Sequence, residues 1–497
     1  TWNDTGLEYN SDKCVHQLFE SMVEISPDAE AVVFENESIA YRELNTRANH
    51  LAYYLIEHGI QSGKPVGVCI ERSVEMIVGI LAVLKAGGAY VPLDPEYPKD
   101  RIAFILDDAN VEVLLTQNKL VDRFSDLMVN LVVLDETNIV LSDEVILNGA
   151  EGLLTVPERP TMNNGNPSGT VVCEYAAYVI YTSGTTGIPK GVTITHKNLL
   201  SLLYAFEHAT PSSRKRVGVS VCSFTFDVSV WEIFSNLCFG GALHILTQVT
   251  FADPPLFADY LTRHKISSAY IPTALLDPVV ERFKETDQKV YLENLLVGVE
   301  PIKQGTLQKF KDLSETIQIV NGYGPSESTI CSTFFLFPEK CDELQRRTPI
   351  GKPVANYQIY LLCPSLNPVP IGVNGEIYIG GHGLAMGYLN LPSLTAEKFI
   401  PNPFTDKPGE RLYKTGDMAR YLSDGTIEFI GRIDNQIKIR GYRIEAGEIE
   451  TVLTEHRGVK QNVVIAREDD PGEKRLVAYI IPDFDYLCDE TEDAEQI

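Results

Sequence analysis

The spacing of apolar residues predicts alternating helices and strands in the first part of the chain. Apolar side chains recur every three or four positions from Val15 to Val23 and from Leu44 to Leu55, which predicts two amphipathic helices. Short β-branched runs then alternate with helical patterns, and runs that are apolar throughout are typical of a parallel sheet covered on both faces. The predicted strands are Pro65–Ile70, Tyr90–Pro92 and Val111–Thr116, and the predicted helices are Val74–Ala86 and Ile102–Ala109.

The pattern changes after a polar connection rich in Pro, Asn and Gly at residues 157–169. Between about residues 350 and 430, short alternating strands separated by Gly, Pro and Asn turns predict a small antiparallel unit. Its strands are Gln358–Leu362, Glu376–Ile379 and Thr426–Ile430. Beyond Asp434 a new pattern predicts a helix over Glu448–Glu455 and strands over Gln461–Arg467 and Arg475–Ile481.

Composition limits the possible functions. A chain of 497 residues exceeds what one hydrophobic core organises, so we expect two or more domains. The net charge of −26 argues against a nucleic-acid partner, since phosphate backbones require Lys and Arg, but it does not exclude ATP. The longest apolar run, Met76 to Leu84, is too short for a bilayer. Nine cysteines without a CxxC pair indicate neither disulfides nor zinc and suit a reducing cytoplasm.

The segment from Thr182 to Gly191, Thr-Ser-Gly-Thr-Thr-Gly-Ile-Pro-Lys-Gly, carries candidate chemistry. Glycines allow close backbone approach, hydroxyl and N–H groups donate to phosphate oxygens, and Lys190 adds a positive charge. The segment therefore predicts a polyphosphate cradle, although the same residue types also make ordinary surface turns. Pro189 before the lysine and Gly191 after it exclude the GxxxxGK[ST] loop of kinases and GTPases.

Other segments offer groups that complement such a loop. In Asn321–Glu327, Tyr323 could stack on a purine, and Glu327 could hold Mg²⁺, which prefers oxygen ligands. Asp417 follows a turn and suits a ribose diol, while Asp227 lies beside aromatic residues. Considered singly, each has a structural alternative: a core tyrosine, a turn cap, or ordinary helix packing.

Taken together and in this order, the segments resemble the adenylate-forming enzymes, and within them the amino-acid adenylation domains of nonribosomal peptide synthetases. The resemblance covers nearly the whole chain and extends to the opening segment, which looks like the linker that follows a condensation domain. Further matching segments are Trp2–Thr5, Cys14–Phe19, Ile39–Leu44, Leu84–Asp94 and Gly375–Leu389.

The resemblance implies an α/β fold. We expect a large N-terminal domain of stacked α/β sheets with a small β-barrel-like unit over residues 1–433. A small, incomplete α+β C-terminal subdomain follows over 434–497, with Asp434 as the hinge about which it rotates. The family joins a carboxylic acid to AMP, releases pyrophosphate, and passes the acyl group to a phosphopantetheine thiol on a carrier domain.

The resemblance also assigns roles to residues. Thr182, Lys190 and Glu327 would be catalytic, with Glu327 as the Mg²⁺ ligand. The remaining ATP contacts would be Ser183, Gly184, Thr185, Thr186 and Gly187 on the phosphates, Asn321, Gly322, Tyr323 and Phe429 at adenine, and Asp417 and Arg432 at the ribose.

Asp227 points to the substrate class. Its carboxylate would pair with an α-ammonium group, which fatty-acid relatives do not need, so an α-amino acid is implied. Because Gly298 and Gly322 leave volume between mostly apolar walls, we predict a large side chain, Tyr- or Phe-like first. Arg comes second, because Glu207 at a helix end could pair with a guanidinium, unless it is simply an exposed acid. The other implied pocket residues are Val228, Trp231, Tyr270, Leu296, Ile330 and Cys331.

The chain departs from the family pattern at two places. The usual Gly-Gly-Glu is Gly298-Val299-Glu300 here, which we expect to alter the pocket wall. The family's catalytic lysine, in an Asn-Gly-Lys segment, does not follow Ile481, and Lys438 is not that residue. We therefore expect the chain alone to be weak or inactive. The unusual continuation from Asp483 suggests an inserted N-methyltransferase in the parent protein, or a divergent tail.

Two other functions compete with amino-acid adenylation. The first is a non-catalytic nucleotide-binding or docking module within a megasynthase. The second is a stand-alone acyl-CoA ligase, which Asp227 and the linker-like opening disfavour.

Overall fold

The computed structural model describes residues 2–134, 164–167, 171–184, 188–211, 215–433, 437–439, 442–470 and 473–483. Its largest element is a mixed sheet of nine strands, whose central members β9 to β13 run parallel. In spatial order the strands are β15 (Lys352–Pro353), β14 (Thr333–Leu336), β13 (Gln318–Tyr323), β12 (Asn294–Gly298), β11 (Ser268–Tyr270), β9 (Val217–Ser220), β10 (Ala242–Ile245), β1 (Glu30–Phe34) and β2 (Glu37–Ala40).

A second mixed sheet has seven strands and contains the predicted parallel strands near the N-terminus. In spatial order they are β18 (Gly387–Tyr388), β8 (Lys190–Thr195), β7 (Ala176–Thr182), β4 (Ala89–Pro92), β3 (Pro65–Val68), β5 (Val113–Thr116) and β6 (Asn130–Val133). The parallel, helix-covered arrangement expected from their apolar runs is confirmed for β3, β4 and β5. β7 and β8 instead form an antiparallel hairpin, which places the predicted phosphate loop at its turn.

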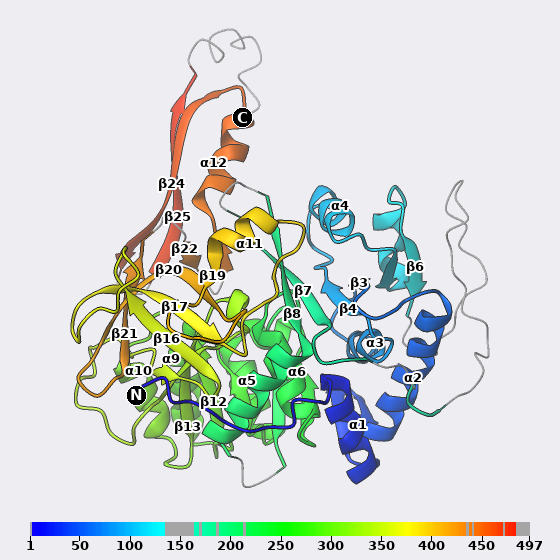
Figure 1. The fold of residues 1–497 in the computed structure, drawn as a ribbon. Coiled ribbons are helices and arrows are strands. Elements are labelled where there is room, and N and C mark those ends of the chain that lie inside the picture. The colour runs from blue at the N-terminus through cyan, green and yellow to red at the C-terminus, as the bar shows by residue number, and fades with distance from the viewer. Residues whose placement is uncertain are drawn as a thin grey trace, which may run out of the picture.

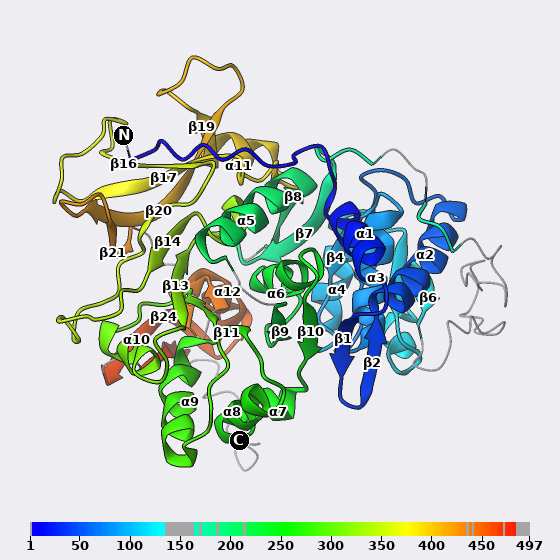
Figure 2. The ribbon, with the colours of Figure 1, turned by 90° about the horizontal axis from the view of Figure 1, so that it is seen from below.

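Helices fill the space between the two sheets and cover their outer faces (Figure 1, Figure 2). α5 packs on β8, α6 packs on β9 and β10, and these helices also pack on each other, so they join the sheets. α3 is buried along its whole length, which explains the apolar run from Met76 to Leu84 within it. The helices of this part are α1 (Val15–Ile25), α2 (Tyr41–Glu57), α3 (Val74–Lys85), α4 (Lys99–Asp108), α5 (His196–Ala209), α6 (Val228–Leu237), α7 (Gln248–Ala252), α8 (Pro254–Arg263), α9 (Thr273–Thr286) and α10 (Gln304–Lys311).

A third, antiparallel sheet of five strands confirms the small unit predicted after residue 350. Its long central strand, β20, pairs with β17, β19 and β21, so it fixes the register of the whole unit. The strands are β16 (Tyr357–Leu362), β17 (Gly375–Gly381), β19 (Phe399–Pro401), β20 (Arg411–Tyr421) and β21 (Ile427–Arg432), and the short helix α11 (Pro392–Lys398) precedes β19.

The C-terminal part carries the predicted helix and two strands, and it projects from the body of the molecule (Figure 1). α12 packs on β24, which forms a two-stranded antiparallel sheet with β25. The elements are β22 (Ile437–Ile439), β23 (Tyr442–Ile444), α12 (Ala446–Glu455), β24 (Val459–Asp470) and β25 (Glu473–Pro482). The predicted hinge, Asp434, and the tail beyond 483 lie outside the described residues.

The sequence also led to expectations about disulfides and membrane-spanning helices. The eight cysteines in the described part of the chain are all free thiols, as the absence of paired spacing predicted. Among the described residues, no helix has both the length and the apolarity that a membrane span requires.

Candidate active site

Two adjoining cavities lie at the carboxyl ends of the parallel strands β12 and β13, the edge where open α/β sheets bind ligands. The larger cavity, of about 720 Å³, is enclosed by β13, β20 and β21 on one side and by residues 445–447, 450 and 463–466 of the C-terminal part on the other. The smaller one, of about 70 Å³, lies against the start of α6. Five residues line both cavities: Val299, Gly322, Tyr323, Asp417 and Arg432.

Asp417 links two of the predicted nucleotide residues. The register of β20 and β21 pairs Asp417 with Arg432, and the Arg432 Nη1 donates to Asp417 Oδ1 at 2.6 Å. The hydroxyl of Tyr323, at the end of β13, donates to the other carboxylate oxygen at 2.5 Å. Burial, followed by the negative charge of Asp417, raises the pKa of the Tyr323 hydroxyl well above its usual range, so it remains a donor. The network holds the carboxylate at the cavity wall, where sugar hydroxyls could reach it.

The wall beside this network is aromatic. The rings of Tyr323 and Phe429 have centroids 6.2 Å apart and an interplanar angle of 40°. Asn321 also lines the larger cavity, and its amide nitrogen donates to the Pro349 carbonyl at 2.8 Å, which fixes the side-chain plane. Aromatic faces next to a fixed amide suit a planar purine base. The structure thus brings together the adenine and ribose residues predicted from sequence.

The predicted phosphate loop connects β7 to β8, and Thr182 pairs directly with Lys190 across this hairpin. The Thr182 hydroxyl is buried and has no hydrogen-bond partner among the described residues. A buried donor left in this way fits an oxygen-rich ligand such as a phosphate. Thr185, Thr186 and Gly187, which were predicted to contact the phosphates, lie outside the described residues.

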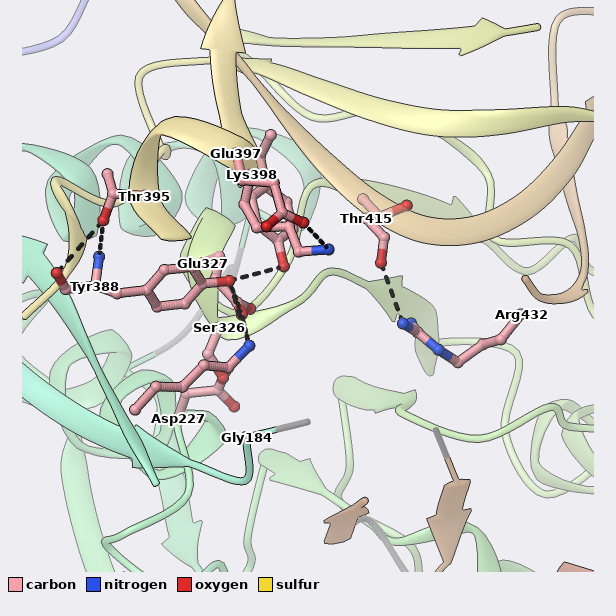
Figure 3. A network of polar contacts seen from close by, with 12 residues as sticks. Gly184, Asp227, Ser326, Glu327, Tyr388, Thr395, Glu397, Lys398, Thr415 and Arg432 are labelled. Carbon is pink, nitrogen blue, oxygen red and sulfur yellow. Dashed lines mark hydrogen bonds and ion pairs between the residues drawn. The ribbon is translucent and has the colours of Figure 1, made fainter. Parts of the chain in front are cut away.

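Lys190 lies in a buried polar cluster with Glu327 and Tyr388. The Tyr388 hydroxyl donates to Glu327 Oε1 at 2.8 Å (Figure 3). The Lys190 Nζ lies 3.3 Å from the same oxygen. The Lys190 Nζ is also 4.6 Å from the centre of the Tyr388 ring, within cation–π range. The Glu327 carboxylate offers the oxygen ligands that a hard cation such as Mg²⁺ prefers, so this residue fits that ion.

Sequence analysis assigned no role to Tyr388. It belongs to the Gly375–Leu389 segment, which carried only the family resemblance. β18 pairs Tyr388 with Val192 of β8, and this pairing brings the tyrosine over Lys190. A tyrosine two residues after a Gly-Leu-Ala-Met run gives no signal for such a contact, because the contact depends on a strand pairing between distant segments.

The C-terminal part reaches the phosphate loop through Glu448. The backbone N–H of Gly184 donates to Glu448 Oε1 at 3.4 Å. Burial raises the pKa of the Glu448 carboxyl above its ordinary value. Because a carboxylate oxygen accepts from this amide, the backbone of the loop presents a hydrogen-bond donor toward the space between the loop and the C-terminal part.

Asp227 lies at the start of α6 and is buried. Its carboxylate does not cap the helix; instead, Oδ2 accepts a 2.5 Å hydrogen bond from the Ser326 hydroxyl (Figure 3). Asp227 and Ser326 both line the small cavity. A buried carboxylate held in this way can bind a cationic group strongly, because the surroundings screen the charges weakly.

Most of the predicted pocket residues line the small cavity, but the space expected at the glycines is already filled. A Cβ on Gly322 would lie 2.7 Å from the Cys331 sulfur, and a Cβ on Gly298 would lie 2.1 Å from the Gly322 carbonyl oxygen. Gly298 therefore allows β12 to lie close to the backbone of β13, and Gly322 allows the Cys331 side chain to approach β13, so neither leaves volume for a substrate. The predicted residues that do line this cavity are Asp227, Val228, Tyr270, Leu296, Gly298, Gly322, Ile330 and Cys331.

Two predicted pocket residues are not among those lining the cavity. Trp231 is buried, with its ring 4.9 Å from that of Phe206 on α5. Glu207 forms an ion pair with Arg216, whose guanidinium also donates to the Ser235 carbonyl at 2.9 Å. The guanidinium expected beside Glu207 is therefore supplied by the chain itself, which removes the basis for predicting an Arg substrate.

Arg72 and Glu232 hold the loop that leads from β9 toward Asp227, and neither was predicted. The Arg72 guanidinium donates to the carbonyls of Ser220, Val221 and Cys222 at 3.2, 2.6 and 2.7 Å. The fully buried Glu232 carboxylate accepts from the N–H groups of Val221 and Cys222, each at 3.1 Å. Burial raises the pKa of Glu232 to about 7. Its position directly after Trp231 resembles ordinary helix sequence and gives no signal of this role.

Comparisons with known proteins agree with this geometry. Residues 19–389 match the sequence profile of the AMP-binding enzymes. The chain is 42% identical to tyrocidine synthase 1 of Brevibacillus parabrevis, over 96% of this chain and 41% of that protein. It is 41% identical to bacitracin synthase 1 of Bacillus licheniformis, over 97% of this chain and 8% of that protein. The chain thus spans less than half the length of these relatives.

Solved structures give the same result. The artificially fused adenylation–PCP di-domain NpsA-ThdA from Klebsiella oxytoca is 26% identical, with a TM-score of 0.79 over 96% of this chain and 90% of that chain. The nonribosomal peptide synthetase FmoA3 is 28% identical, with a TM-score of 0.76 over 87% of this chain and 44% of that chain. The chain therefore belongs to the family of AMP-binding enzymes and is an ATP-dependent adenylation domain of the type found in nonribosomal peptide synthetases.

Proposed function

We propose that the chain activates an α-amino acid as an aminoacyl-AMP for transfer to a carrier domain in peptide synthesis. The observation that carries this proposal is the buried Asp227 carboxylate, held by Ser326 in a cavity that shares its wall with the Tyr323–Asp417–Arg432 network. A carboxylate placed there would bind the α-ammonium group and would leave the substrate's own carboxylate facing the nucleotide.

The reaction joins two anions. An oxygen of the amino-acid carboxylate forms a bond to the α-phosphorus, and the bond from that phosphorus to the bridging oxygen breaks, so pyrophosphate leaves with the electron pair. Like charges about 4 Å apart repel by roughly 4 kcal/mol at a surface-like dielectric, so positioning and cations must lower the barrier. No protein nucleophile is needed.

The nucleotide site is proposed to have an adenine, a ribose and a phosphate part. Tyr323, Phe429, Asn321 and Gly322 would face adenine, and Asp417 with Arg432 would bind the ribose. Lys190 and the residues from Thr182 to Gly187 would bind the phosphates. Glu327 would hold Mg²⁺, which would supply positive charge to offset that of the phosphates. The Glu327 carboxylate would then balance the charge of both Lys190 and the ion.

We further propose an apolar amino acid, with a Tyr- or Phe-like side chain ranked first. The walls formed by Val228, Leu296, Ile330 and Cys331 are apolar, which favours such a side chain over a charged one. A ring of that size would require the side chains of Leu296 and Cys331 to turn aside. Arg ranks below, because Glu207 is engaged by Arg216.

The surroundings of the domain are also proposed. Residues 434–497 would form a C-terminal subdomain that rotates about Asp434 between adenylation and transfer to a phosphopantetheine thiol. A condensation domain would lie upstream, and the unusual residues from Asp483 onward would mark an inserted N-methyltransferase. The free cysteines are compatible with the cytoplasm. Methyl transfer from S-adenosylmethionine by the full-length protein tests the insertion, and its absence would contradict it.

Amino-acid-dependent exchange of labelled pyrophosphate into ATP tests the proposal. The full-length protein should exchange with one or a few apolar amino acids, and Asp227→Ala should abolish that exchange. Asp259→Ala, which removes a carboxylate paired with Arg282 on the outer helices α8 and α9, is the matched control and should retain it. Exchange with fatty or aryl acids would indicate an acyl-CoA ligase, and ATP binding without any exchange would indicate a nucleotide-binding module.

A further inference from the structure

Val299 adopts a backbone conformation that β-branched residues avoid. Its φ is +70°, in the left-handed region, where a side chain branched at Cβ crowds its own peptide groups. It directly follows Gly298, the last residue of β12, at the point where the chain leaves the sheet. Strain of this kind persists only where the surrounding structure holds the residue in place, and it concentrates at functional sites.

Residues with this type of strain gather around the small cavity. Among the non-glycine residues with positive φ in the described part of the chain, those branched at Cβ are Val299, Thr329 and Ile330. Val299 and Ile330 line the small cavity, and the Thr329 hydroxyl is fixed by a 2.7 Å hydrogen bond to the Gly383 carbonyl. Others, such as Leu366, line neither cavity.

Val299 also lies on the boundary between the two cavities. It is one of the five residues that line both, and three of the others, Tyr323, Asp417 and Arg432, are bonded to one another. The fourth, Gly322, has no side chain. Among these five residues, the isopropyl group of Val299 is thus the side chain that shapes the boundary without belonging to the polar network.

We propose that Val299 is a specificity-determining residue whose side chain forms the partition between the amino-acid pocket and the nucleotide cavity. The proposal rests on the proposed function, since the amino-acid carboxylate must meet the α-phosphate across this boundary. Glycine, which the family pattern has at this position, would relieve the strain but would open the partition. The strain at Val299 is retained because the isopropyl group limits which side chains fit beside the nucleotide.

Three variants separate the side-chain contact from the strain. Val299→Gly removes both, while Val299→Ala keeps a side chain in the left-handed conformation but loses the branch. Leu366→Gly is the matched control, because it removes a side chain at φ +60° in a loop away from both cavities. Each variant is measured for ATP affinity by calorimetry, for thermal midpoint, and for pyrophosphate exchange across amino acids of increasing size.

We expect Val299→Gly to weaken ATP binding roughly 3- to 10-fold, the effect of losing a partly buried branched side chain. In pyrophosphate exchange, the ratio of kcat/KM for the best amino acid to that for the next larger one should also fall by about tenfold or more in Val299→Gly. This is the effect of enlarging a pocket by a few carbon atoms. Val299→Ala should give an ATP affinity and an amino-acid preference between those of Val299→Gly and the unmodified protein. Leu366→Gly should change neither the ATP affinity nor the amino-acid preference.

The proposed partition is contradicted if Val299→Gly keeps both its ATP affinity and its amino-acid preference within about twofold of the unmodified protein. This holds whatever the change in thermal midpoint. If the unmodified protein exchanges with no amino acid, the proposed function fails instead. In that case the ATP affinities still decide whether Val299 shapes the nucleotide cavity.

Discussion

The Tyr388 hydroxyl donates a 2.8 Å hydrogen bond to Glu327 Oε1, the same oxygen that lies 3.3 Å from the Lys190 ammonium. Both charged groups are buried, so the tyrosine supplies a donor to a carboxylate that water does not reach. Because its ring also lies against the Lys190 ammonium, one side chain from a distant strand holds both members of the ion pair.

Tyr388→Phe tests this relationship. The ring remains beside Lys190, but the hydrogen bond to a buried charge is lost, which costs about 1.5–3 kcal/mol, or roughly a 10- to 100-fold fall in kcat/KM for pyrophosphate exchange. Tyr260→Phe removes the same atom from a hydroxyl bonded to His244 outside the cavities and is the control. Equal activities for the two variants would contradict a role for Tyr388.

Asp417→Asn should weaken nucleotide binding. The substitution keeps the size of the side chain, but it leaves Arg432 without its ion-pair partner and weakens the bond from Tyr323. We expect the Kd for ATP, measured by calorimetry, to rise about 10- to 100-fold. Asp277→Asn removes a carboxylate that pairs with Lys309 at 2.7 Å away from the site, and it should leave the Kd unchanged. A similar Kd for both variants would remove the ribose assignment.

Glu232 should make stability depend on pH. Burial raises its folded-state pKa to about 7 from an ordinary value of 4.5, so between these values the folded protein binds more protons than the unfolded chain. The free energy of unfolding contributed by this residue therefore falls as pH rises from about 4.5 to 7, by roughly 3 kcal/mol.

Urea unfolding of Glu232→Gln at pH 5 and pH 8 measures that contribution. Relative to this variant, the unmodified protein should lose roughly 3 kcal/mol of stability between the two pH values. Glu281→Gln changes an exposed position on α9, and its free energy of unfolding should equal that of the unmodified protein at both pH values. A constant difference between Glu232→Gln and the unmodified protein would contradict the raised pKa.

Gly298→Ala should be strongly destabilising, because its Cβ would lie 2.1 Å from the Gly322 carbonyl oxygen at a φ of +144°. We expect a loss of roughly 3–5 kcal/mol in urea unfolding, from backbone crowding combined with the unfavourable φ. Gly372→Ala has a φ of +80° and open space around the added carbon, so it should lose only about 1–2 kcal/mol. Equal losses would show that the contact between β12 and β13 can relax.

The sequence identified the elements well where the hydrophobic period was regular. The helix predicted from Val15 is α1, the helix predicted over Val74–Ala86 is α3, and the strand predicted from Arg475 corresponds to β25. Tyr323, Asp417 and Arg432 were predicted to bind the nucleotide, and each belongs to a short ordered motif. The structure shows that Tyr323 and Arg432 both donate to the Asp417 carboxylate.

The pocket could not be predicted in the same way. Gly298 and Gly322 were expected to leave volume, but the meaning of a glycine depends on what faces it, and here the facing atoms are Cys331 and the neighbouring strand. Glu207 was considered as a partner for a substrate guanidinium or as an exposed acid, yet it forms an ion pair with Arg216, only nine residues away in sequence. Side-chain direction and packing across strands decide both cases.

By itself, the sequence determined the fold class and the family, and it predicted the nucleotide-binding groups, because these depend on local periodicity and on motifs of adjacent residues. Only the tertiary structure decided which distant groups meet. Pairings between remote segments bring Tyr388 to Lys190 and Glu327. They also bring Arg72 and Glu232 to the loop after β9, and they place the strained Val299 between two cavities. Such contacts are set by strand register and close packing, which no local pattern records.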